Sequence, residues 1–203
     1  MRVGTDLFGI GTTIFGENRQ RFEINGDLAL DKYFLVADFG IDNFNLDNQV
    51  LDKQTFSYNN KGYYFRIGAD VNFMPNDPNH HAIFFGVRYA RSFFSDKLSW
   101  QGENEYFDVP PIESGNDNVR GQWFELAAGM KVNIWKELFV GYTVHYKFFR
   151  KINNEGILTP YEMPGYGNYE KETRVGFNYQ IFWRFPFKKN ATIQKEVEGA
   201  IAE

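Results

Sequence analysis

The chain has 203 residues, enough for one all-β domain or two small ones, and we expect one. A formal net charge of -4 argues against a nucleic-acid-binding protein, and the lack of cysteine excludes disulfide frameworks, thiolate metal sites and cysteine nucleophiles. The sequence has no run of about 18 apolar residues, which excludes a transmembrane helix, yet aromatic residues make up 19% of a chain whose mean hydropathy is -0.48, so these rings need an apolar surface to face.

Apolar and polar residues alternate with a period of two along most of the chain, which predicts β-strands. The stretch YYFRIGADVNF shows the pattern best, with Phe65 and Val71 on one phase and Arg66 and Asp70 on the other. We predict eight strands, in chain order at about 2–14, 20–30, 32–43, 63–73, 82–95, 121–135, 138–150 and 171–187.

The connections between these strands differ in length in a regular way. The second, fourth and sixth are short, at 30–32, 74–81 and 135–137, whereas three others are long, at 44–61, 97–120 and 151–170. In an up-and-down meander, alternate connections lie at the same end, so the short turns share one end with both termini. We therefore predict one barrel domain over 1–187, followed by a tail at 188–203 that forms a short helix or a frayed terminus.

Alternation alone does not decide which face of the strands meets water. A soluble lipocalin-like barrel encloses its apolar residues around a ligand, whereas a transmembrane barrel turns them outward against lipid. Short turns at one end and long loops at the other favour the transmembrane barrel. Small residues also suit the crowded interior of an eight-stranded barrel, and the polar phase carries a glycine near the middle of most strands, at Gly40, Gly68, Gly86, Gly129, Gly141 and Gly176.

Charged residues of both signs occupy the polar phase, with more arginine than lysine and more aspartate than glutamate. The planar guanidinium of arginine satisfies several acceptors at once, which suits a packed ionic network. One cation, Arg91, falls on the apolar phase, where it lies at the lipid headgroups or marks a β-bulge. We predict that a lumen ionic network is formed by Asp6, Arg21, Glu23, Asp27, Asp38, Arg66, Asp70, Arg88, Glu125, Lys131, His145, Lys147, Arg174 and Arg184.

The sequence contains four short motifs: Val3-Gly4-Asp6-Leu7, Phe22-Glu23-Ile24-Asp27, Lys61-Gly62-Tyr63-Arg66-Gly68-Asp70 and Gly86-Arg88-Tyr89. These motifs resemble those of a family of small outer-membrane barrels from Bacteroidota that has no assigned function. The likeness covers about residues 2–95 and, more loosely, the last three strands. It implies an exported protein with a cleaved signal peptide and carries over no catalytic residue. The final strand FNYQIFWRFPF also resembles the targeting signal of outer-membrane barrels, although 16 residues follow Phe187.

Histidine gives the sequence its only candidate for catalysis. Lipid A deacylases and palmitoyl transferases of the outer membrane pair a histidine with serine and an acid, but His145 has Tyr146 and Lys147 beside it and no hydroxyl at the right spacing. His80 and His81 are adjacent in an extended turn and point in opposite directions, so they make a poor metal pair. Aromatic residues in the long loops are candidate binding anchors, namely Trp100, Tyr106, Phe107, Tyr161, Tyr166 and Tyr169.

Together, these patterns predict an all-β, eight-stranded antiparallel up-and-down transmembrane β-barrel of the bacterial outer membrane, with periplasmic termini. We expect a non-enzymatic protein without cofactor or metal, with a lumen plugged by side chains and a structural or interaction role, including as a subunit of a larger complex. Its expected partners are the lipid bilayer, lipopolysaccharide and other envelope proteins, and not nucleic acid. Two alternatives stay open: a soluble barrel that binds an apolar ligand, and a lipid-modifying enzyme of the outer membrane.

Overall fold

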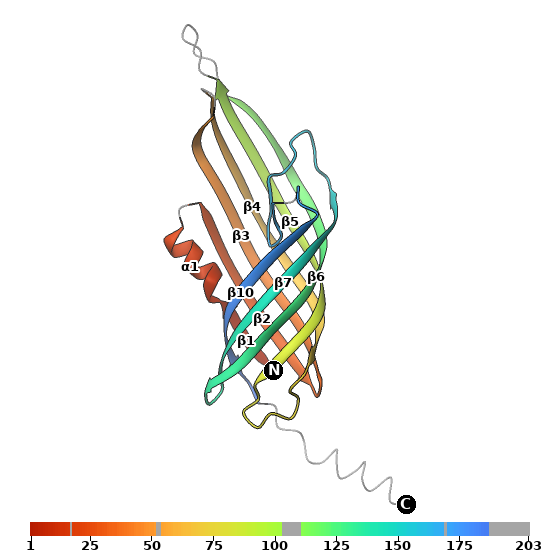
Figure 1. Ribbon diagram of the computed structural model, residues 1–203. Coiled ribbons are helices and arrows are strands. Elements are labelled where there is room, and N and C mark those ends of the chain that lie inside the picture. The colour runs from red at the N-terminus through yellow and green to blue at the C-terminus, as the bar shows by residue number, and fades with distance from the viewer. Residues whose placement is uncertain (17, 52–53, 103–110, 169, 187–203) are drawn as a thin grey trace, which may run out of the picture.

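A computed structural model describes residues 1–16, 18–51, 54–102, 111–168 and 170–186 (Figure 1). The structure is almost entirely β, and no helix among these residues is long and apolar enough to cross a membrane. In chain order the elements are β1 (Arg2–Asp6), α1 (Leu7–Phe15), β2 (Arg19–Leu30), β3 (Tyr33–Leu51), β4 (Gln54–Asn72), β5 (Ala82–Gly102), β6 (Ile112–Trp135), β7 (Leu138–Asn153), β8 (Glu162–Met163), β9 (Gly167–Asn168) and β10 (Thr173–Arg184).

Eight of these strands form one antiparallel sheet that closes on itself, in the order β1-β10-β7-β6-β5-β4-β3-β2. Strand β1 completes the ring, because it pairs with β10 from Arg2↔Arg184 to Asp6↔Gln180 and with β2 from Arg2↔Asp27 to Thr5↔Ile24. Strands β8 and β9 form a separate small hairpin. The predicted all-β fold of eight antiparallel strands in meander order is confirmed for the described part of the chain.

The long strands turn their polar phase toward the inside of the ring and their apolar phase outward. On β4, Arg66 and Asp70 are fully buried, whereas Ile67 and Val71 are 51% and 40% exposed. Burial alternates in the same way along β6 and β7. Charged side chains therefore lie inside and apolar side chains lie outside. In a water-soluble domain the arrangement is the opposite, with apolar residues in the core and charged residues on the surface.

The two described ends of the chain meet at the end of the ring that carries the short turns. The backbone N–H of Phe185 donates to the carbonyl of Met1 at 2.8 Å, and that of Arg184 donates to Glu137, in the β6–β7 turn, at 2.8 Å. Figure 1 places the N-terminus at this lower end. Phe187 and the predicted tail at 188–203 lie outside the described residues.

The prediction of one strand over 2–14 is wrong, because the chain leaves the sheet after Asp6 and forms α1 (Figure 1). The buried Asp6 carboxylate accepts hydrogen bonds from the N–H groups of Phe8 and Gly9 at 3.3 and 3.1 Å, which caps the helix. Helix α1 lies outside the ring and packs on β2 and β10. The hydroxyl of Thr13 accepts from the Arg21 N–H at 2.7 Å and donates to the Arg21 carbonyl at 3.0 Å, replacing the missing strand neighbour.

Two segments predicted as long loops, 44–61 and 97–120, are largely strand. The β3–β4 hairpin continues to Leu51↔Gln54, and β5 pairs with β6 as far as Trp100↔Ile112. Apolar residues continue on one phase of these strands, as at Phe44 and Leu46 or Phe56 and Tyr58, but they are interspersed with polar and glycine residues, so the pattern was not taken as strand. Side chains add to the backbone ladder here, because Tyr58 donates to Asp96 and its ring contacts Phe44. Figure 1 shows this extension as the long strands that rise above β7 and β10.

The connection between β7 and β10 is a long loop, as predicted from 151–170, but part of it turns into the ring. Five consecutive residues, Glu162 to Tyr166, are buried. The sulfur of Met163 lies so close to Gly121 on β6 that a Cβ at Gly121 would be 1.9 Å from it. This loop therefore fills the upper part of the interior.

Candidate functional site

Arg66 forms the centre of the buried ionic network. Its guanidinium pairs with Glu23 on β2, lies 3.2 Å from Asp38 Oδ2 on β3, and lies 3.8 Å from Glu125 Oε2 on β6. The hydroxyl of Tyr64 donates to the same Glu23 carboxylate. These groups are almost completely removed from solvent, so the loss of either partner of a pair leaves an uncompensated buried charge.

The network continues across β3, β4 and β5. Arg88 places Nη1 at 2.8 Å from Asp38 Oδ2 and Nη2 at 3.2 Å from Asp70 Oδ2. The side-chain amide of Asn25 donates to Glu23 at 2.7 Å and to Asp38 at 2.8 Å. Opposite charges thus alternate across the ring, and each guanidinium holds more than one carboxylate.

His145 is part of the same network and is fully buried. Its Nδ1 lies 2.8 Å from Glu125 Oε2, and the indole N–H of Trp123 donates to the other Glu125 oxygen at 2.6 Å. Its cross-strand neighbours are Gly176 and Ala127. Among the described residues no hydroxyl is hydrogen-bonded to this ring, so the arrangement lacks the nucleophile that a histidine base would activate.

A second ion cluster lies near the short-turn end. The Asp27 carboxylate accepts a hydrogen bond from Arg2 Nε at 2.8 Å and also forms an ion pair with Lys131. Aromatic side chains surround these two cations inside the closed sheet, which adds cation–π attraction to the ion pairs. The Arg2 guanidinium lies 4.5 Å from the centre of the Phe34 ring, and the Lys131 ammonium lies 4.9 Å from the centres of the rings of Phe84 and Phe182.

Two arginines of the predicted network lie at its margins. Arg184 is at the lower rim, where its Nη2 lies 3.2 Å from Glu137 Oε1, because it ends β10 and reaches the β6–β7 turn. This hydrogen bond lowers the pKa of Glu137. Arg174 is only half-buried and lies beside Gly167 of the β7–β10 loop, and within the described residues it forms no ion pair.

The inserted loop closes the network at its upper end. Lys147 donates to the carbonyl of Gly165, and the N–H of Gly165 donates to Asp42 at 3.3 Å. Arg19 lies 2.6 Å from Asp42 and 3.5 Å from Glu162, whose pKa is raised by burial. The loop is therefore tied to side chains of β2, β3 and β7.

The structure places most of the predicted network on the inside of the ring, as the alternation implied. Sequence reasoning left out Arg2, Arg19, Asp42 and Tyr64. The polar phase already contained Arg2, Asp42 and Tyr64, so strict alternation pointed to them, whereas Arg19 lay outside the predicted strand. The predicted residues found inside are Asp6, Arg21, Glu23, Asp27, Asp38, Arg66, Asp70, Arg88, Glu125, Lys131, His145 and Lys147.

Comparison with known families gives one match. Residues 1–190 match the family described as a domain of unknown function, DUF6048. The chain belongs to the DUF6048 family. No curated protein and no solved structure matches it.

The loop residues predicted as binding anchors in this DUF6048 chain divide into three groups. Tyr166 is a correction: it is 3% exposed and packs against Trp123, with ring centres 5.8 Å apart, because its loop folds inward. Burial raises the pKa of its phenol to about 12. Tyr161 stacks on Phe44 while remaining 47% exposed, and Trp100 is 36% exposed on β5. Tyr106, Phe107 and Tyr169 lie outside the described residues.

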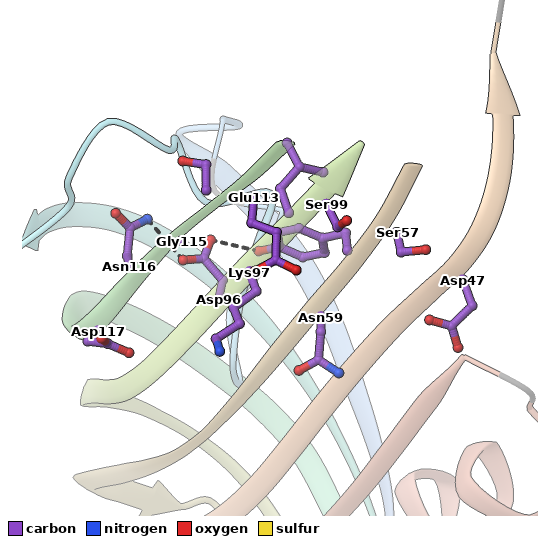
Figure 2. A pocket seen from close by; sticks show the side chains of 13 residues that line it. Asp47, Ser57, Asn59, Asp96, Lys97, Ser99, Glu113, Gly115, Asn116 and Asp117 are labelled. Carbon is purple, nitrogen blue, oxygen red and sulfur yellow. Dashed lines mark hydrogen bonds between the residues drawn. The ribbon is translucent and has the colours of Figure 1, made fainter. Parts of the chain in front are cut away.

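The strand extension above the ring carries a polar pocket of about 420 Å³ formed by β3 to β6 (Figure 2). Asp96 accepts hydrogen bonds from the Asn116 amide at 2.9 Å and the Tyr58 hydroxyl at 3.1 Å. Asp47 and Glu113 also line it. Within the described part of the chain, no three His, Cys, Asp or Glu side chains group so as to hold a metal ion, so these carboxylates make no recognisable calcium site.

The outward-facing apolar residues form a continuous belt, here called the apolar band. On each long strand it covers nine to eleven positions, and above it the outward residues become polar, as at Asn43, Lys61, Ser95 and Gln122. The band runs over Tyr33–Ile41 on β3, Tyr63–Val71 on β4, Ile83–Phe93 on β5, Phe124–Ile134 on β6, Val140–Phe148 on β7 and Val175–Trp183 on β10.

Arg91 lies on the outward face near the upper edge of the apolar band. It pairs in register with Phe65 and Gln122, and the ladder is regular on both sides of it, so the alternative of a β-bulge at this position is wrong. Its guanidinium lies 5.2 Å from the centre of the Phe93 ring. Arg91 therefore remains a cation on the outer face.

Proposed function

We propose that this DUF6048 protein is a non-enzymatic β-barrel of the bacterial outer membrane, with an interior filled by its own side chains and a structural or interaction role. The observation that carries the proposal is the apolar band. The band spans nine to eleven residues of each strand, which agrees with the roughly 9–11 residues that a tilted strand needs to cross the hydrocarbon layer. The termini would then face the periplasm, together with the short turns.

The charged interior supports the same proposal. In a transmembrane barrel the inside is polar, and the outside faces lipid. Here the interior side chains pair with one another across the ring, as Arg66 does with Glu23, Asp38 and Glu125. The inserted segment Glu162–Tyr166 adds to the filling. We expect a barrel filled in this way to leave no continuous water path and to conduct no ions.

The two alternatives have less support. A soluble carrier needs an apolar interior for its ligand, whereas the centre of this ring holds Arg66, Glu23 and Glu125, all fully buried. A lipid-modifying enzyme needs a nucleophile beside an accessible base, whereas His145 is buried against Glu125. An interaction role therefore falls to the outer face and the strand extension, with other envelope proteins as the partners we propose.

The test is extraction and reconstitution of the full-length chain. We expect the protein to remain with outer membranes after high-salt and carbonate washing and to need detergent for release. After reconstitution into planar bilayers, it should give no stable conductance. Recovery of the full-length chain in a detergent-free soluble fraction would refute the membrane assignment, and a steady open channel would refute the filled interior.

A further inference from the structure

Two sets of cations in this chain differ in their surroundings. Most of those inside the ring are paired with carboxylates, as Arg66, Arg88 and Lys131 are. A second set lies on the outward face at the upper edge of the apolar band, one on each of four neighbouring strands, and within the described residues none of its members forms an ion pair. We call this set the cation row; it consists of Lys61 on β4, Arg91 on β5, Arg120 on β6 and Arg150 on β7.

A groove of about 580 Å³ lies between two members of the cation row, Lys61 and Arg120. Its lower wall is aromatic: the rings of Tyr63 and Phe93 belong to the apolar band and stack with centres 5.3 Å apart. One carboxylate, Asp117, also lines the groove, so the two cations still give it a positive balance. The groove is therefore amphipathic, cationic above and apolar below.

Arg91 adds an unsatisfied donor just below this groove. It precedes Phe93 by two positions along β5, on the same outward face. Its Nε is buried and has no hydrogen-bond partner. A buried donor without an acceptor costs free energy, so an anion at this level would supply the acceptor that Arg91 lacks.

We propose that the groove binds the phosphorylated headgroup of a membrane lipid. Lys61, Arg91 and Arg120 contact the phosphate, while the acyl chains lie along the apolar band beneath Tyr63 and Phe93. Arginine and lysine are the usual partners of phosphate, and basic side chains at a membrane surface attract anionic lipids. The proposal rests on the membrane-spanning function proposed above, which puts the groove at the outer leaflet, where the long loops lie.

The test is a lipid titration of the purified full-length protein in a neutral detergent, followed by native mass spectrometry. The probes are lipid A, dephosphorylated lipid A and inorganic phosphate. We expect lipid A to bind and the other two to bind at least about tenfold more weakly, since each charge-assisted hydrogen bond is worth about that factor. Equal binding of dephosphorylated lipid A would overturn the phosphate contact, and equal binding of inorganic phosphate would overturn the assignment to a lipid.

Variants locate the contact on the surface. The double variant Lys61→Gln/Arg120→Gln should lose lipid A affinity by at least about tenfold, and Arg91→Gln should weaken it further. The matched control is Lys136→Gln, which removes an outward cation at the opposite end, where Lys136 lies over the Trp135 ring. An unchanged double variant, or an equal loss in the control, would overturn the proposal.

Membrane insertion is measured separately, by flotation of each protein with phosphatidylcholine vesicles, so that the two proposals fail independently. If the wild type floats but has no preference for lipid A, the inference about the groove is wrong and the membrane function stands. If the wild type does not float, the membrane function itself is wrong.

Discussion

Substitution of Met130 by arginine tests the orientation of the whole sheet. Met130 is 49% exposed on the outward face of β6 and lies near the middle of the apolar band, which runs on that strand from Phe124 to Ile134. If this face meets lipid, Met130→Arg forces a charge into the hydrocarbon layer. If the face meets water, the same change is harmless and raises solubility.

The size of the effect follows from the depth of the site. At about 3.4 Å per residue, the band ends about 20 Å above and 14 Å below Met130 along the strand, and a tilt of about 45° reduces these depths to about 14 and 10 Å. An arginine at the midplane costs about 2–4 kcal/mol. That cost lowers the folded-to-unfolded ratio by about 30- to 700-fold.

The assay is reversible urea unfolding in phospholipid vesicles, followed by tryptophan fluorescence. The matched control is Gln122→Arg on the same strand, above the band, where the cost should be about 0–1 kcal/mol. The inward neighbour Gly129 gives the converse test: a side chain there would place Cβ 2.2 Å from the Tyr142 carbonyl, so Gly129→Leu should fail to fold. If Met130→Arg and Gly129→Leu are both tolerated, the assignment of the faces is wrong.

Three further predictions concern the interior, the helix and the lower rim. Arg66→Met should lower the free energy of unfolding by about 3–5 kcal/mol in the same assay, because it leaves the buried carboxylates without their cation. A decrease below about 1 kcal/mol would contradict the network. Thr13→Val should cost about 1–2 kcal/mol and speed hydrogen exchange of the Arg21 amide, and unchanged exchange would show that α1 does not replace a strand neighbour. Arg184 lowers the pKa of Glu137 from 4.5, so this stabilisation is present above that pH and is lost as the pH falls through the lowered pKa. Glu137→Gln should therefore shift the urea midpoint at pH 7 and not at pH 2; an equal shift at both would exclude the carboxylate.

Several features were predictable from the sequence because they depend on neighbours along the chain. A strand places alternate residues on opposite faces, so the strict pattern at 63–73 fixed which residues share a face with Arg66 and which share one with Phe65. The same alternation pointed to Arg2 and Asp42, although neither was included in the predicted network. The order of the strands followed from the short turns, such as Trp135-Lys136-Glu137.

Other features are set by contacts between distant segments. Arg66 and Glu23 are 43 residues apart, and only closure of the ring decides that they pair. Helix α1 forms where a strand was predicted because Asp6 caps it and Thr13 supplies the hydrogen bonds of a strand neighbour to Arg21. Tyr166 was predicted as a loop binding anchor, but its loop folds into the ring and buries it.

The amino-acid sequence by itself therefore determined the two faces of each strand and their order around the sheet, since both follow from local periodicity and turn length. The tertiary structure alone decided which carboxylate pairs with which guanidinium, where the first strand ends and helix α1 begins, and which segment fills the upper interior. The physical reason is that a buried charge or an open backbone edge has to find its partner in space, and that partner lies tens of residues away along the chain.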